Sequence, residues 1–168
     1  MRACRPGAIT VSSEGAMRLH SWFDACASIG VSPVVLAPVD RDLFATGAAF
    51  VVVRRQRGGC GPILVVTGAK RIGAWTEGMT AVAPLKSLLL RRKAPSQEEV
   101  AAADVLLVAP NSLDTAVYRS VDAEWPVVVY DQADRTFATD ESKLFRNASS
   151  LRARLRIGAI SDRGAVAK

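Results

Sequence analysis

The sequence has 168 residues, of which 49% are hydrophobic and 23% charged, and its formal net charge at pH 7 is +6. This length fits one domain, and the apolar fraction argues against intrinsic disorder. No apolar run approaches the roughly 20 residues of a membrane-spanning helix, so we expect no membrane partner. The positive charge indicates polyanions as candidate partners, although many basic domains bind no nucleic acid.

Most of the basic residues are arginines, which gather at positions 54–57, 91–93 and 152–156. Guanidinium groups suit bidentate contacts with phosphate, but each cluster is equally compatible with an ordinary solvated surface. The three cysteines (Cys4, Cys26 and Cys60) have no paired spacing, and His20 is the single histidine. We therefore expect no disulfide framework, no metal site, and a reducing compartment, either cytoplasm or nucleus, or a viral particle.

Short apolar runs alternate with helical stretches along the chain. The strand candidates are residues 34–37, 63–67, 105–109, 127–130 and 156–160, with a weaker one at 87–90. The helix candidates are residues 14–29, 43–57, 72–79, 112–121 and 141–154, and a short helix to Ala103 that a capping box of Ser96 and Glu99 opens. Continuous apolar strands alternating with helices predict an α/β three-layer sandwich with a mostly parallel sheet. We expect one lobe over 14–163, a flexible N-terminus over 1–13 and a short tail over 164–168.

In such a sheet, ligands bind beyond the carboxyl ends of the strands, so the residues that follow each strand carry the functional signal. The segment after residues 34–37 contains Thr46 and Gly47 but lacks the lysine and the glycines of a phosphate-binding loop. Asp131 ends the fourth apolar run, where a carboxylate could hold magnesium, although an aspartate there is also common turn chemistry. Each signal alone is weak.

The order of the segments is more specific. The chain resembles the first RecA-like lobe of helicase superfamily two ATPases, in particular the Swi/Snf-type DNA translocases. Segments similar to the family's motifs occur in the family's order at residues 17–22, 42–49, 61–75, 103–113, 125–134 and 142–163. The resemblance implies a single P-loop-type lobe, with Thr46, Gly47 and Asp131 as residual nucleotide-binding positions.

The departures from the family pattern predict a loss of catalysis. Ala48 and Ala49 stand where the family has the phosphate-binding lysine and the magnesium-binding threonine, and Gln132 stands where it has the catalytic glutamate. An amide cannot accept the proton of the attacking water. The length leaves no room for a second lobe, so the resemblance implies an inactive helicase-like lobe with no required cofactor, residual ATP and magnesium binding remaining open.

The resemblance also implies nucleic-acid contacts in the loops after the second and third strands, at Lys70, Arg71, Asn111 and Ser112. A solvated basic loop explains Lys70 and Arg71 equally well. We therefore expect a structural or binding subunit of a larger nucleoprotein assembly, with protein partners and nucleic acid as candidates. The alternative is a residual nucleotide or nucleic-acid binding protein. An unrelated small α/β enzyme is disfavoured, because the sequence has no G-x-S-x-G motif and one histidine.

Overall fold

A computed structural model describes residues 14–37, 40–59, 61–91, 95–113, 124–133, 146 and 150–161. These residues contain a six-stranded sheet in the order β1-β6-β5-β2-β4-β3, and every neighbouring pair is parallel. The strands are β1 (Val34–Ala37), β2 (Ile63–Val66), β3 (Ser87–Leu90), β4 (Val105–Val108), β5 (Trp125–Asp131) and β6 (Ala153–Ser161). The predicted α/β class and all six predicted strands are confirmed, including the weak candidate at 87–90.

The described helices are α1 (Glu14–Ser28), α2 (Asp40–Gln56), α3 (Ile72–Thr80) and α4 (Gln97–Ala102), with short 3-10 helices η1 (Ala69–Arg71) and η2 (Pro110–Ser112). The predicted capping box opens α4, because the Ser96 hydroxyl accepts from the Glu99 backbone N–H and the Glu99 carboxylate accepts from that of Ser96. Helix α2 is followed by Gly58 at φ +82°, a left-handed conformation that glycine adopts at low cost.

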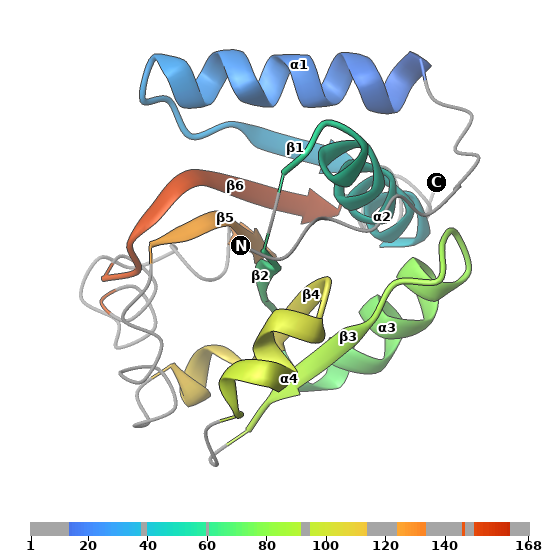
Figure 1. Ribbon diagram of the computed structural model, residues 1–168, viewed down its shortest axis with the longest axis vertical. Coiled ribbons are helices and arrows are strands. Elements are labelled where there is room, and N and C mark those ends of the chain that lie inside the picture. The colour runs from blue at the N-terminus through green and yellow to red at the C-terminus, as the bar shows by residue number, and fades with distance from the viewer. Residues whose placement is uncertain are drawn as a thin grey trace, which may run out of the picture.

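The central strands β2, β4 and β5 are buried on both faces, so the sheet is the middle layer of three. Along β2, Ile63 and Val65 pack into one core with Phe23 of α1 and Trp75 of α3, whereas Leu64 and Val66 point into the other. This alternation is the ordinary two-residue period of a strand. Helices α1, α2 and α3 cover the first face and α4 lies over the second, with β1 and β3 at the two sides of the sheet (Figure 1).

Two helix predictions differ from the structure. The predicted helix 141–154 is wrong at its end, because β6 begins at Ala153, three residues before the predicted strand start. Leu155 and Ile157 are buried while Arg154 is exposed, and Ala153 pairs with Trp125, so a two-residue period prevails there. Residues 141–145 and 147–149 lie outside the described part. Of the predicted helix 112–121, Ser112 ends η2, and residues 114–121 also lie outside it.

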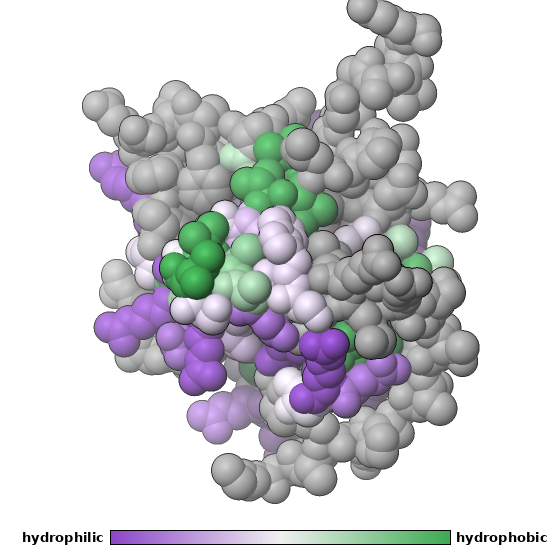
Figure 2. All heavy atoms as spheres, turned by 90° about the horizontal axis from the view of Figure 1, so that it is seen from above, coloured by the Kyte–Doolittle hydropathy of each residue, from purple (hydrophilic) through white to green (hydrophobic). Residues whose placement is uncertain are grey.

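Four large hydrophobic residues are exposed around the end of α1 and the start of β1: Trp22, Ile29, Val31 and Val34. Figure 2 shows the face above α1, where hydrophobic areas lie among hydrophilic ones.

None of the helices in the described residues is long and apolar enough to cross a membrane. The predicted terminal segments, 1–13 and 164–168, fall outside the residues that the structure describes.

Candidate functional site

The carboxylate of Asp131 lies at the carboxyl end of β5, and its side chain is completely buried. The pairing of β5 with β2 places Tyr130 opposite Val66, so the next residue along each strand brings Thr67 beside Asp131. The Thr67 hydroxyl donates a hydrogen bond to Asp131 Oδ2 at 2.6 Å. The sheet register therefore supplies the first partner of this carboxylate.

Arg71 supplies the positive charge that a buried carboxylate requires. It ends the 3-10 helix that follows β2, and its Nε lies 2.6 Å from Asp131 Oδ2 while its Nη2 lies 3.0 Å from Oδ1. This is a bidentate contact, in which the planar guanidinium matches the carboxylate. The Arg71 side chain is 10% exposed, and its Cζ lies 5.5 Å from the centre of the Phe44 ring of α2.

Trp75 completes the arrangement from the first turn of α3. Its Nε1 donates to Asp131 Oδ2 at 2.9 Å, and its ring centre lies 4.8 Å from that of Phe44. Arg71 and Trp75 are four residues apart, a spacing that puts both on one side of a helical segment. We call Thr67, Arg71, Trp75 and Asp131 the Asp131 cluster; within it, one carboxylate accepts four hydrogen bonds from three side chains.

The Asp131 cluster bears on two predictions, which stay predictions. Arg71 was predicted to contact nucleic acid, but its guanidinium is buried against Asp131. Asp131 was predicted as a residual nucleotide and magnesium position, but its carboxylate is enclosed and already paired with a cation. A magnesium ion would have to displace the guanidinium to reach these oxygens. The cluster is therefore built as a charge-balanced structural contact between β5, β2 and α3.

Thr46 and Gly47 do not lie in a loop. They belong to α2, which begins at Asp40 and takes in the whole segment 42–49 that resembles the family's phosphate-binding loop. A Cβ on Gly47 would lie 2.9 Å from Trp75 Cζ3, so this glycine lets helix α2 approach the indole ring. Ala48 is fully buried in the apolar core. The nucleotide-binding role of Thr46 and Gly47 stays a prediction, and both residues lie within a helix.

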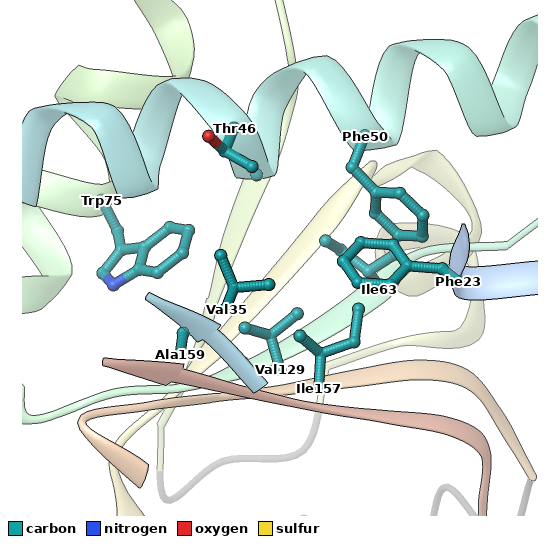
Figure 3. Close-up of a pocket in the computed structure, with 10 residues that line it drawn as sticks. Phe23, Val35, Thr46, Phe50, Ile63, Trp75, Val129, Ile157 and Ala159 are labelled. Carbon is teal, nitrogen blue, oxygen red and sulfur yellow. The ribbon is translucent and has the colours of Figure 1, made fainter. Parts of the chain in front are cut away.

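Thr46 and Gly47 instead line a small apolar cavity of about 30 Å³ between α2 and the sheet. Figure 3 shows Thr46 and Phe50 of α2 above Val35, Val129 and Ile157 of the strands, with Trp75 at one side and Phe23 at the other. Ligand pockets are typically about 300–1,000 Å³. This cavity is about a tenth of the lower limit and has the size of one water molecule, so it is not a nucleotide site.

The remaining predicted nucleic-acid residues lie at the carboxyl edge of the sheet. Lys70 in η1 and Asn111 in η2 are exposed, and Ser112 is partly buried. The two loops are neighbours, because the Thr67 backbone N–H donates to the carbonyl of Val108 at 2.9 Å. The structure thus brings together the two loops that the sequence singled out, and of their two basic residues only Lys70 faces outward.

Gln132 follows Asp131 with a φ of +54°, a left-handed conformation that is uncommon for a residue other than glycine. No group of three or more potential metal ligands occurs within the described residues. On the second face, burial raises the pKa of Tyr130 to about 12, and the positive charge and hydrogen bond of Arg156 oppose this rise.

Sequence reasoning did not identify Thr67 and Trp75 as partners of Asp131. Both lay in segments that resembled the family, but their connection depends on which strands are neighbours. The usable signals were the threonine directly after the β2 run and the four-residue spacing of Arg71 and Trp75. Neither signal points to Asp131 unless β2 and β5 are known to pair.

Comparisons with known proteins support the fold. No protein-family model matches the chain, and no curated protein sequence matches it. Among solved structures, the Sulfolobus solfataricus SWI2/SNF2 ATPase core in complex with dsDNA matches with a TM-score of 0.71 and 18% identity, covering 95% of this chain and 34% of that chain. The same organism's SWI2/SNF2 ATPase core domain matches with a TM-score of 0.70 and 19% identity, covering 94% and 32%. The chain thus has the fold of a RecA-like lobe of such a core and spans about a third of its length.

Proposed function

We propose that this chain is a catalytically inactive helicase-like lobe that serves as a structural or nucleic-acid-binding subunit of a larger nucleoprotein assembly. One observation carries the proposal: the carboxylate that ends β5 is held by the Arg71 guanidinium and by Thr67 and Trp75, inside the protein. In P-loop ATPases an aspartate holds the magnesium that bridges the phosphates. Here the charge of the corresponding carboxylate is neutralised by the protein itself.

The residues that would bind phosphate support the same conclusion. A phosphate-binding loop needs exposed backbone N–H groups and a lysine. The segment 42–49 is helical, and Ala48, at the lysine position, points into the apolar core. Gln132 supplies an amide where hydrolysis needs a general base. Loss of these groups together leaves no chemical route to ATP hydrolysis.

The fold and the surface charge support nucleic acid as a partner. The neighbour named above is an ATPase core in complex with dsDNA. This chain has a formal net charge of +6, and Lys70 and Asn111 are exposed on adjacent loops at the carboxyl edge. We carry these two residues forward as candidate contacts. We also propose that the assembly contains protein partners and lies in a reducing compartment, either the cytoplasm or the nucleus, or in a viral particle.

The proposal is tested by measuring phosphate release from ATP by the purified chain, with and without DNA. We expect no release above the buffer blank. The matched variants are Gln132→Ala and Asp131→Asn, each checked for folding by circular dichroism. A release rate that both variants leave unchanged is a contaminant and agrees with the proposal. A rate that falls at least tenfold in either folded variant would overturn the inactive assignment.

A further inference from the structure

The amino edge of the sheet, where the parallel strands begin, carries a concentration of positive charge. Arg54 and Arg55 lie in the last turn of α2 with Arg57 just beyond it, Lys86 precedes β3, and Arg152 and Arg154 flank the start of β6. We call these six residues the amino-edge row: Arg54, Arg55, Arg57, Lys86, Arg152 and Arg154. They come from three distant parts of the sequence, so no sequence motif contains them.

One half of the amino-edge row is joined by contacts across β6, β5 and β2. Arg154 Nε lies 3.0 Å from Oε2 of Glu124, which directly precedes β5. Arg54 Nη1 donates to the carbonyl of Gly61, just before β2, at 2.8 Å. A Cβ on Gly61 would lie 4.0 Å from the Pro126 side chain of β5. The starts of these three strands are therefore adjacent.

The other half continues across β4 and β3. Arg55 forms an ion pair with Asp104, which directly precedes β4. The other oxygen of Asp104, Oδ2, accepts from the backbone N–H of Lys86 at 2.7 Å. Neighbouring strands are about 4.8 Å apart, so the row spans roughly 19 Å from β6 to β3. That length corresponds to about five nucleotide steps of 3.4 Å along one strand of a duplex.

Three members of the amino-edge row have an acidic partner among the described residues. Glu124 faces Arg154, Asp104 faces Arg55, and Asp24 of α1 lies 3.7 Å from Arg57. Lys86 and Arg152 are exposed, and neither side chain forms an ion pair within the part of the chain that the structure describes. The Arg154 side chain is 76% exposed despite its partner.

The described part of the opposite edge also carries exposed basic residues. Of the described residues that directly follow or lie in the loop after a strand, the exposed basic ones are Lys70 after β2 and Arg91 after β3. We propose that the amino-edge row binds the phosphate backbone of a nucleic acid. Guanidinium groups make up most of the row and suit bidentate contacts with phosphate oxygens, and the formal net charge of +6 favours a polyanion as the partner.

This inference rests on the nucleic-acid part of the proposed function and adds a surface that lies on the side of the sheet away from Lys70 and Asn111. It does not depend on the loss of ATP hydrolysis. The experiment below separates the two ideas: absence of any DNA binding contradicts the nucleic-acid part of the proposed function, whereas binding that is insensitive to the amino edge contradicts the inference alone.

The test compares two double variants of equal charge change by fluorescence anisotropy with a labelled DNA duplex and the matching single strand. Lys86→Glu with Arg152→Glu removes the ends of the amino-edge row, and Lys70→Glu with Arg91→Glu changes the carboxyl edge. All four side chains are exposed. At about 50 mM salt we expect the first pair to weaken binding at least tenfold and more than the second pair. The slope of log K against log salt should become shallower by about two, since each lost phosphate contact contributes roughly 0.9.

Equal losses in the two double variants would overturn the inference, because the amino edge would then contribute no more to binding than the carboxyl edge. A loss of affinity below twofold in the amino-edge double variant would also overturn the inference. Wild-type binding that does not change between about 50 and 200 mM salt would overturn it as well. A neutral variant, Lys86→Gln with Arg152→Gln, repeats the measurement without charge reversal. It should weaken binding about threefold or more with an unchanged thermal unfolding midpoint, and an unchanged affinity would count against the proposed surface.

Discussion

The guanidinium of Arg71 forms a bidentate contact with the carboxylate of Asp131, with Nε 2.6 Å from Oδ2 and Nη2 3.0 Å from Oδ1, although the two residues are 60 positions apart in the chain. Both side chains are buried, and the guanidinium carbon lies over the Phe44 ring. The pair joins the end of β5 to the start of α3 at the edge where related folds bind their ligands. At that edge the pair forms part of the protein's packing.

Removal of Arg71 should therefore destabilise the fold strongly. The variant Arg71→Met keeps the apolar stem but leaves the Asp131 carboxylate buried without a cation, which costs about 3–5 kcal/mol for a pair of this kind. Urea unfolding followed by Trp fluorescence measures the loss. The double variant Arg71→Met with Asp131→Asn should lose less than the sum of its single variants, because the neutral amide needs no counter-charge. A single-variant loss below 1 kcal/mol would contradict the assigned role.

Gly47 should resist substitution even though it lies in a helix. Alanine normally stabilises a helix interior by up to about 1 kcal/mol relative to glycine. In Gly47→Ala the new Cβ would lie 2.9 Å from Trp75 Cζ3, so we expect a net loss of about 1–3 kcal/mol from overpacking. The matched control is Gly73→Ala in α3, where a Cβ meets nothing within 4 Å. Thermal unfolding should show a lower midpoint for the first variant and an equal or higher one for the second, and the reverse order would refute the packing role.

A lysine introduced at position 48, where the resembled family has one, should not create nucleotide binding. Ala48 is fully buried in the apolar core between α2 and the sheet, so Ala48→Lys would place an ammonium group there. Burial of an unpaired charge is costly, and we expect a loss of several kcal/mol of stability. Isothermal titration with ATP and magnesium checks binding, and urea unfolding checks stability. A folded Ala48→Lys variant that gains ATP affinity would show that this segment keeps a loop-like conformation.

Alkaline pH should weaken the fold through Tyr130. Its pKa is raised from 10.0 to about 12 because burial disfavours the charged phenolate. Below pH 10 the neutral form is present in both states, and the full stabilisation is retained. Between about pH 10 and 12 the unfolded chain ionises while the folded one stays neutral, so stability falls as pH rises, by on the order of 3 kcal/mol in total. Near-isosteric Tyr130→Phe lacks this term, so its stability relative to wild type should rise between about pH 9 and 11.5. A constant difference would refute the assignment.

Much of the fold followed from local patterns. The apolar runs at β1, β2, β4 and β5 are long enough only for strands, and their continuity indicated burial on both faces. The capping box at Ser96 and Glu99 placed the start of α4 correctly. The helix predicted to Arg154 failed because alternating burial within β6 outweighs the helical propensity of an arginine-rich segment.

By itself the sequence determined the strand–helix alternation, because residue identity and short-range periodicity are local properties. That Ala48, Ala49 and Gln132 stand at the reactive positions of the resembled family stays a prediction. The tertiary structure alone decided what the remaining polar residues do. From the sequence, Arg71 is predicted to be a surface cation, whereas the pairing of β2 with β5 brings Asp131 to it. Lys86 and Arg152 are isolated charges in the sequence, and the sheet order places both along one edge. Strand order is a long-range property: whether a charge is buried in a pair or displayed to a partner depends on which strands are neighbours.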